Sequence, residues 1–335
     1  MLPDMRLASA LPLEQCVGQT IMVGFAGHEP SRELIELIER DGIGGVILFS
    51  RNLRDARQTR ALTDALQACA RRADHPAPLL IATDQENGLV RRMGHAATVL
   101  PGNMALGATD EPRLAYAVAL ATGRELRALG INMNLAPVAD VNNNPRNPVI
   151  GVRAFGSDPA RVARMVAAAT RGYAAAGVIA TLKHFPGHGD TQVDSHLALP
   201  AVPYGLQRLE VVELVPFAAG IGAGVPCVMT AHLALPGLTG DAALPATLAP
   251  AALRDLLRGR LGFGGVVVTD CLEMRAIAGG VGVAPGAVRA LAAGADLALI
   301  SHTVAAQRTA LAAITAAVRG GALARDVVTT AAARV

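Results

Sequence analysis

The densest group of reactive side chains lies in the segment 183–196, which reads KHFPGHGDTQVDSH. It holds three of the eight histidines, two aspartates and Lys183, the only lysine among 30 basic residues. Gly187 and Gly189 permit sharp backbone turns, so this segment is predicted to be a loop that follows a strand. Asp194 and His196 are two residues apart, which places both side chains on one side of an extended backbone. A carboxylate that orients an imidazole in this way makes a general acid/base for neutral pH.

The same segment also admits a metal site, because imidazole and carboxylate groups are common metal ligands. The candidate ligands are His184, His188, Asp190 and His196. Lys183 argues against this interpretation, since its ammonium group would stand next to the metal ion. The acid/base interpretation is therefore favoured over the metal site.

Two further polar segments follow apolar runs. DQENGLVRR (84–92) supplies two acids and two arginines, which suit an anionic or multiply hydroxylated ligand. A solvated charged loop is the alternative interpretation. NNNPRNPVIGVRAFG (142–156) is rich in amide side chains and in turn formers, and in it only Arg153 is expected to do more than support turns.

The elements that position these segments are eight short apolar runs separated by longer amphipathic stretches. Eight apolar strands that alternate with helices indicate parallel βα units covered on both faces. We predict an α/β fold, a single (β/α)8 TIM-type barrel over residues 1–335, with a doubly wound open sheet as the alternative. The segments 101–110 and 140–157 are predicted to be long loops. The expected strands cover 20–26, 44–49, 78–84, 131–140, 178–184, 225–232, 264–270 and 295–300.

Charged or polar side chains recur at the ends of these predicted strands. Asp84, Asp140, His184, His232 and Asp270 each stand at or just after the carboxyl end of a run. In a barrel all these ends open on one face, where active sites lie. We therefore expect the five residues to meet on that face.

The bulk composition narrows the class of partner. Apolar residues make up 52% of the 335 residues and the net charge is +3, with basic residues spread along the chain. This pattern gives no reason to expect a nucleic acid or a membrane as partner. The amino-terminal segment has no apolar stretch long enough for a secretion signal, so we predict a cytoplasmic protein. Cys16, Cys69, Cys227 and Cys271 are scattered, and we expect each to be a small buried apolar residue.

Taken together, these segments resemble glycoside hydrolase family 3, and within it the bacterial cytoplasmic β-N-acetylglucosaminidase branch. The resemblance rests on KHFPGHGDTQVDSH, DQENGLVRR, NLAPVADVNNNPRNPVIGVRAFG (134–156), the AH of MTAHLALP, PATL (245–248) and VVVTDCLEM (266–274). It implies a barrel without the second sandwich domain of longer members. It also implies a monomer or homodimer that acts on small carbohydrates, with no metal or organic cofactor.

The resemblance further implies residue roles in a retaining, two-step displacement. Asp270 matches the nucleophile, and His196 held by Asp194 matches the acid/base group. The residues that match those holding the hydroxyl and acetamido groups of the sugar are Asp84, Arg92, Arg153, Lys183 and His184. The expected reaction is removal of terminal β-linked N-acetylglucosamine. The expected natural substrates are peptidoglycan fragments that arise during cell-wall recycling.

Two positions depart from the family pattern. Asn87 replaces a glycine of DQEGG, and asparagine tolerates a left-handed backbone, although its side chain is expected to narrow or redirect the pocket. Cys271 replaces the acid after the nucleophile, and the loss of a neighbouring negative charge is expected to ease ionisation of Asp270.

Several alternatives remain open at this point. A histidine acid/base in place of an anionic carboxylate lets inorganic phosphate approach, so a phosphorylase or β-glucosidase of the same family is one alternative. A sugar-binding barrel without turnover is another, supported only by Asn87 and Cys271. A metal-dependent amidohydrolase barrel is the last alternative, and insensitivity to chelators would exclude it.

Overall fold

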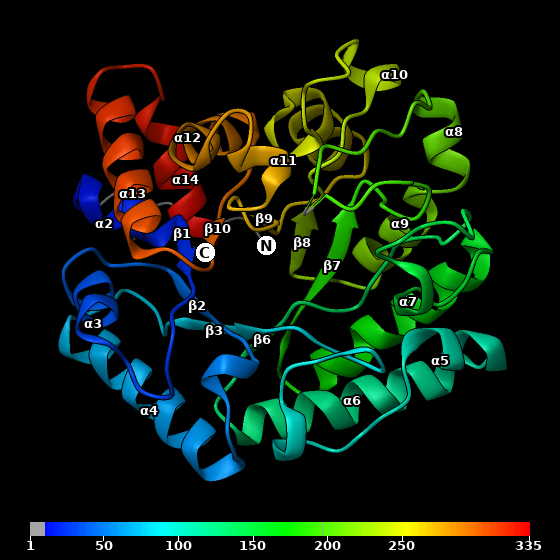
Figure 1. The fold of residues 1–335 in the computed structure, drawn as a ribbon, viewed down its shortest axis with the longest axis horizontal. Coiled ribbons are helices and arrows are strands. Elements are labelled where there is room, and N and C mark those ends of the chain that lie inside the picture. Colours follow the sequence, from blue (N-terminus) through cyan, green and yellow to red (C-terminus); the bar gives the residue numbers. More distant parts are fainter. Residues whose placement is uncertain (1–10, 196) are drawn as a thin grey trace.

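Residues 11–195 and 197–335, which the computed structural model describes, contain eight parallel strands arranged as a barrel (Figure 1). The strands neighbour one another in the order β10-β1-β2-β3-β6-β7-β8-β9. A parallel bridge between Val268 and Leu297 brings β9 against the residue before β10 and closes the ring. The predicted (β/α)8 barrel is therefore confirmed over the open sheet. The strands are β1 (Ile21–Val23), β2 (Gly45–Leu48), β3 (Leu80–Thr83), β6 (Met133–Asn134), β7 (Ile179–Phe185), β8 (Cys227–Thr230), β9 (Val266–Thr269) and β10 (Ala298–Ile300).

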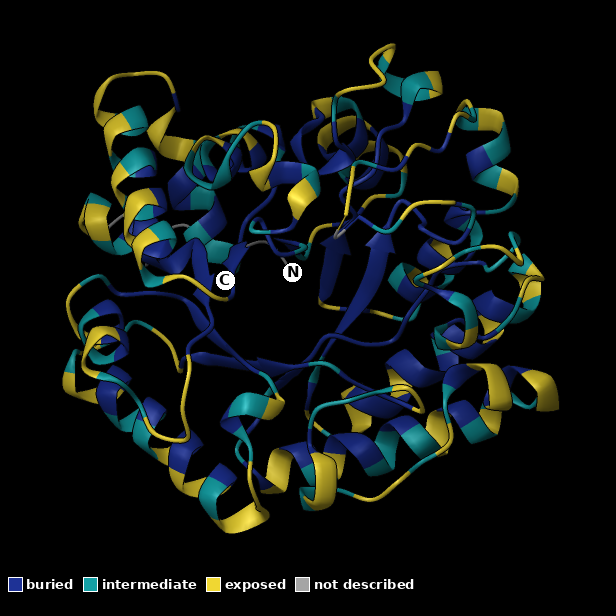
Figure 2. Cartoon of the chain, viewed as in Figure 1, coloured by how far each residue is buried: buried dark blue, intermediate teal, exposed yellow. Residues whose placement is uncertain are grey.

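A helix follows each strand and covers the outside of the barrel (Figures 1 and 2). These helices are α3 (Arg32–Glu39), α4 (Ala56–Arg72), α6 (Pro112–Ala128), α7 (Pro159–Ala175), α9 (Leu214–Gly222), the π-helix η5 (Ala251–Arg260), α12 (Val283–Ala293) and α13 (Val304–Arg319). Two terminal helices, α2 (Leu13–Gln19) and α14 (Arg325–Arg334), pack against each other. Among the described residues, no helix is long and apolar enough to cross a membrane.

Shorter elements lie in the loops between these units. They are the hairpin strands β4 (Gln85–Asn87) and β5 (Val90–Arg91), the helices α5 (Asn103–Thr109), α8 (Leu206–Val211), α10 (Pro236–Thr239) and α11 (Arg275–Ala278), and the short 3-10 turns η1 (Ser50–Asn52), η2 (Gly94–Ala96), η3 (Gly151–Arg153) and η4 (Ala246–Leu248). Most of them lie on the face to which the carboxyl ends of the strands point, and so they surround the site described below.

Local sequence explains where the long helices begin and end. The side chain of Asp55 accepts a hydrogen bond from the amide of Gln58 at 2.8 Å and caps α4, and Asp158 caps α7 in the same way. Gly130 and Gly177 follow α6 and α7 with φ of 77° and 71°, a left-handed conformation that glycine adopts without a steric penalty. These helices lie in the amphipathic stretches between the predicted strands.

The strands are apolar because they are covered on both faces. One set of buried side chains fills the barrel interior, including Met22, Ile47, Met133, Met229 and Leu299. A larger set packs between the strands and the surrounding helices. Figure 2 shows the consequence, with buried strands inside a ring of helices that are exposed on their outer faces. The side chains that fill the barrel interior lie beneath the polar residues at the carboxyl ends of the strands.

The observed strands are shorter than or shifted from the predicted runs by a few residues, and two predicted segments differ more. The segment 101–110, expected to be a loop, contains the helix α5, which lies against Phe155 so closely that a Cβ on Gly107 would stand 1.6 Å from its carbonyl oxygen. The strand expected over 131–140 is regular only at Met133–Asn134, because Pro137 has no N–H for the ladder. The 140–157 segment is a loop as predicted, apart from the turn η3.

Candidate active site

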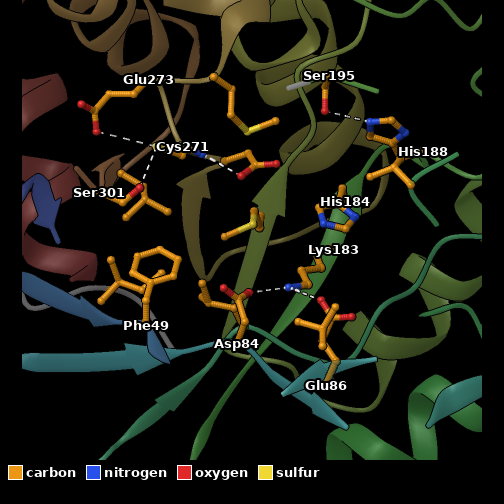
Figure 3. A pocket seen from close by; sticks show the side chains of 18 of the residues that line it. Phe49, Asp84, Glu86, Lys183, His184, His188, Ser195, Cys271, Glu273 and Ser301 are labelled. Carbon is orange, nitrogen blue, oxygen red and sulfur yellow. Dashed lines mark hydrogen bonds and ion pairs between the residues drawn. The ribbon is translucent and has the colours of Figure 1, made fainter. Parts of the chain in front are cut away.

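A cavity of about 660 Å³ opens on the face formed by the carboxyl ends of the strands. It is large enough for a monosaccharide and part of a second group. Figure 3 shows the side chains of several strand ends pointing into it from opposite walls. The structure brings six of the predicted site residues together here: Asp84, Arg92, Arg153, Lys183, His184 and Asp270.

Lys183 lies at the centre of one wall of the cavity, on β7. Its Nζ lies 2.7 Å from Asp84 Oδ1 and 2.6 Å from Glu86 Oε1, and its side chain is 2% exposed. Burial lowers the pKa of Lys183, but the two carboxylates outweigh burial and hold it above its ordinary value. The only lysine of the chain is therefore a charged group fixed inside the cavity.

Glu86 is the partner that this lysine shares with an arginine. Arg153 donates from Nε and Nη2 to the two carboxylate oxygens of Glu86, at 2.9 and 2.8 Å. Burial raises the pKa of Glu86, yet Lys183 and Arg153 lower it to about 2. Sequence reasoning left Glu86 out of the site, although it stands two residues after Asp84 and so faces the same way along an extended backbone.

His184, next to the lysine, is held by Asp140. Asp140 Oδ2 lies 2.7 Å from His184 Nδ1, and Arg153 Nη2 lies 3.3 Å from Nε2. A guanidinium can only donate, so Nε2 accepts and Nδ1–H donates to Asp140. Burial raises the pKa of Asp140, but His184 and His188 lower it to below its ordinary value. Three of the predicted strand-end residues, Asp84, His184 and Asp140, thus belong to one network that runs through Lys183, Glu86 and Arg153.

Asp270 stands on the opposite side of the cavity, directly after β9. Its Oδ1 accepts a hydrogen bond of 2.7 Å from the amide of Cys271. Shielding from bulk water raises the pKa of Asp270, but His232, His184 and the Cys271 amide outweigh it and hold the pKa below the ordinary value. The group is therefore an ionised carboxylate aimed into the cavity.

His232, the fifth predicted strand-end residue, lies behind this wall and does not line the cavity. Its Nε2 lies 2.9 Å from the carbonyl oxygen of Cys271, and its Nδ1 lies 2.8 Å from Thr247 Oγ1. It holds in place the backbone that carries Asp270.

Cys271 lines the cavity with a protonated thiol. Its sulfur lies 2.9 Å from Ser301 Oγ, and burial raises the pKa of the thiol to about 11. The residue therefore brings no negative charge beside Asp270, as expected from its replacement of an acid. All four cysteines are free and buried, which confirms that part of the prediction.

Asn87 does not narrow the cavity, contrary to expectation. Its φ of 70° is the left-handed conformation that the replaced glycine would adopt. Its Nδ2 donates to Thr122 Oγ1 on α6 at 2.9 Å, and the residue is not among those that line the cavity. The left-handed backbone turns this side chain away from the sugar-sized space and towards α6.

Arg92 completes the rim beside Asp84, with Nε 4.0 Å from Asp84 Oδ2. This buried Nε has no hydrogen-bond partner within 11–195 and 197–335. Its guanidinium lies 5.9 Å from the ring centroid of Phe49, whose ring stacks on His302 at 5.8 Å. Arg92 thus lines the cavity as a half-buried cation next to Asp84.

A further wall was missed by sequence reasoning. It consists of Phe49, which follows β2, Ser301 and His302, which follow β10, and Glu273, which follows β9. Glu273 accepts hydrogen bonds from the amides of His302 and Thr303 at 2.6 and 3.0 Å. The strand-end rule that identified Asp84 and Asp270 applies equally to these residues and would have found them.

Of the predicted acid/base pair, the structure describes Asp194. His196 lies outside the described residues. Asp194 is half-buried, and its carbonyl oxygen accepts from the amides of Leu197 and Ala198, so the backbone turns after Asp194 and is not extended there. Ser195 lines the cavity opposite Glu273 and Ser301 (Figure 3). The roles of Asp194 and His196 stay a prediction.

The described part of the chain contains no group of three or more His, Cys, Asp or Glu side chains arranged to hold a metal ion. Of the four candidate ligands named from the sequence, His184 and His188 lie near each other, with ring centroids 6.0 Å apart. Both rings are instead used in hydrogen bonds to other side chains.

Gly189 provides a test of how tightly the loop after β7 is seated. A Cβ on this residue would lie 1.8 Å from the carbonyl oxygen of Val141, a backbone atom that cannot move aside. We expect Gly189→Ala to lower the free energy of unfolding by about 1–3 kcal/mol through overpacking. Gly222→Ala is the matched control, because nothing lies within 4 Å of its Cβ. Equal urea midpoints for the two variants would contradict the close contact.

Comparison with known proteins agrees with this geometry. A "Beta-hexosaminidase A" of Pseudoalteromonas piscicida is 41% identical over 88% of this chain and 54% of its own length. A family 3 β-N-acetylglucosaminidase from Paenibacillus sp. str. FPU-7 superposes with a TM-score of 0.95 and 52% identity, over 97% of this chain and 61% of that one. A β-N-acetylhexosaminidase from Beutenbergia cavernae DSM 12333 superposes with a TM-score of 0.89 and 35% identity, over 97% of both chains.

The chain thus spans little more than half the length of the first two relatives and nearly all of the third. Residues 12–335 match the family described as "Glycosyl hydrolase family 3 N terminal domain". Together with the barrel and the polar network at its strand ends, this match shows that the chain belongs to glycoside hydrolase family 3.

Proposed function

We propose that residues 1–335 form a single catalytic domain that removes terminal β-linked N-acetylglucosamine from small saccharides with retention of configuration. The observation that carries this proposal is Asp270, an ionised carboxylate in a cavity of about 660 Å³ whose other wall holds fixed hydrogen-bonding groups. The name of the Paenibacillus protein supports N-acetylglucosamine as the sugar, and the name of the Beutenbergia protein supports an N-acetylhexosamine.

In the proposed first step, a carboxylate oxygen of Asp270 attacks the anomeric carbon as the bond to the leaving oxygen breaks. The leaving oxygen takes a proton from His196, which Asp194 orients. In the second step water attacks the same carbon, gives its proton back to His196, and Asp270 is released. Two inversions at one carbon retain the configuration.

The opposite wall is proposed to hold the sugar. Lys183 can donate three hydrogen bonds, and Asp84 and Glu86 receive two of them, so one remains for a hydroxyl. Arg92, Arg153 and His184 complete the wall. Because Lys183, Arg153 and His184 are already paired with carboxylates and largely buried, they need little reorganisation when a positive charge develops on the sugar ring.

The proposal extends to the natural substrate, the compartment and the working form of the protein. We propose peptidoglycan fragments as natural substrates and the cytoplasm as the compartment, where reduced thiols persist; the four free cysteines support this. The proposed working form is a monomer or homodimer. No cofactor is proposed.

The test compares release of 4-nitrophenol from the β-N-acetylglucosaminide and the β-glucoside, each with and without inorganic phosphate. We expect turnover of the acetamido sugar that is independent of phosphate. A rate that requires phosphate would establish a phosphorylase, and preference for the glucoside would establish a β-glucosidase. Binding of N-acetylglucosamine without turnover of either substrate would establish a sugar-binding barrel.

A further inference from the structure

The loop after β7 is fastened to the barrel at its base. The amide of His188 donates to Asp140 Oδ1 at 2.6 Å, and its carbonyl oxygen accepts from Asn147 Nδ2 at 2.8 Å. Asn147 Nδ2 also lies 3.2 Å from Thr191 Oγ1. His188 and Thr191 are buried. The segment 188–191 is thereby bound to the neighbouring 140–147 loop through both backbone and side chains.

The His188 ring is held on both nitrogens. Nδ1 lies 2.7 Å from Thr191 Oγ1, and Nε2 lies 3.1 Å from Ser195 Oγ. Burial and the neighbouring His184 lower the pKa of His188, so the ring is neutral and one nitrogen donates while the other accepts. Hydroxyl groups can satisfy either arrangement. The ring is therefore a rigid connection from the base of the loop to Ser195.

Ser195 lies at the far end of the same loop. It is 2% exposed, while Val193, two residues before it, is 41% exposed. The chain thus leaves the barrel after Thr191 and returns to it at Ser195, where the hydroxyl contacts His188 (Figure 3). Its carbonyl oxygen accepts from the amide of Ala276, six residues after Asp270, at 3.4 Å. Ser195 is therefore hydrogen-bonded to both walls of the cavity, through His188 and through Ala276.

We propose that Ser195 is a positioning residue for proton transfer, whose hydroxyl, bound to His188, sets the place of the acid/base pair that flanks it in the chain. This inference rests on the proposed function. In the chain Asp194 precedes Ser195 and His196 follows it, so a change at Ser195 acts directly beside both members of the proposed pair. A general acid must lie within hydrogen-bond reach of the leaving oxygen, and a small displacement reduces its contribution.

The test is a series of aryl β-N-acetylglucosaminides whose leaving phenols differ in pKa. A 2,4-dinitrophenolate leaves without a proton, whereas an unsubstituted phenolate needs one. For Ser195→Ala we expect kcat/KM to fall by about 10- to 100-fold on the phenyl substrate, part of the contribution of a general acid. On the dinitrophenyl substrate we expect a change of less than about twofold, since that step needs no acid.

Ser195→Thr keeps the hydroxyl and is expected to restore most of the activity on the phenyl substrate. Ser157→Ala, at an exposed serine outside the cavity, is the matched control. An equal loss on all leaving groups would show a structural role and overturn the proposal, as would no loss at all. A wild type that fails on every member of the series would instead overturn the proposed function itself.

Thr191 provides a second, independent readout. If its hydroxyl acts on Ser195 through the His188 ring, Thr191→Val and Ser195→Ala remove the same connection. We then expect the double variant to lose about as much activity on the phenyl substrate as the worse single variant, not the product of both losses. Multiplicative losses would show that the two hydroxyls act separately and would contradict the connection through His188.

Discussion

Asp270→Ala is expected to lower kcat/KM on the β-N-acetylglucosaminide by about 10⁴-fold or more, as loss of a group that bonds to the reacting carbon does in other covalent enzymes. The carboxylate of Asp270 is ionised, faces the cavity and accepts a hydrogen bond from the Cys271 amide, so it can act as a nucleophile. The measurement is release of 2,4-dinitrophenolate, whose departure needs no proton, so that the loss reports the nucleophile alone.

Azide separates loss of the nucleophile from loss of the fold. In Asp270→Ala the space left by the carboxylate admits this small anion, and attack from that side yields a glycosyl azide of inverted configuration. We expect azide to restore turnover in a concentration-dependent way. Asp255→Asn, at an exposed aspartate on η5, is the matched control and should behave as wild type. A folded Asp270→Ala variant with near-normal activity would assign the nucleophile to another residue.

Glu86→Gln is expected to lower the free energy of unfolding by about 3–5 kcal/mol at neutral pH, the usual cost of removing one partner of a buried ion pair. Glu86 is buried and pairs with two cations, Lys183 and Arg153. The amide keeps the size of the side chain but leaves a net positive charge in the wall of the cavity. Urea denaturation of both proteins measures the difference.

The difference should depend on pH with a defined sign. The folded-state pKa of Glu86 is lowered to about 2, so its stabilising contribution is complete above its unfolded pKa of about 4.3. It is lost as the pH falls through about 2. We therefore expect the stabilities of wild type and Glu86→Gln to converge as the pH is lowered from about 4.5 to 2. A difference that does not change over this range would show that the carboxylate charge is not what stabilises the wall.

A double-mutant cycle distinguishes charge pairing from loss of packing. Arg153→Gln removes the cation that binds Glu86 through two hydrogen bonds. In that background Glu86→Gln should cost less than in wild type, by about 0.5–3 kcal/mol, the usual range for side chains that share a network. Additive effects would mean that Glu86 and Arg153 contribute independently.

The strand ends show how far sequence reasoning reaches for the site. Asp84, His184 and Asp270 were found because each follows or ends an apolar run, and parallel strands bring such ends to one face of a barrel. His232 obeyed the same rule and yet lies behind the wall, holding the Cys271 backbone. The rule predicts the face on which a residue stands and does not predict whether its side chain lines the cavity.

Closure into a barrel was decided only by the tertiary structure, because the sequence pattern left an open sheet as the alternative. By itself, the sequence determined the alternation of eight strands with helices, the family and the polar face. These follow from hydrophobic periodicity, helix caps and short motifs, which act between residues close together in the chain. Only the tertiary structure decided that Glu86 pairs with both Lys183 and Arg153, that Asn87 turns towards α6, and that Ser195 returns to His188. Arg153 and Glu86 are 67 residues apart, and Lys183 and Asp84 are 99 apart. Which side chains become partners depends on which ones the closed barrel brings within hydrogen-bond reach. No local sequence pattern contains that spatial distance.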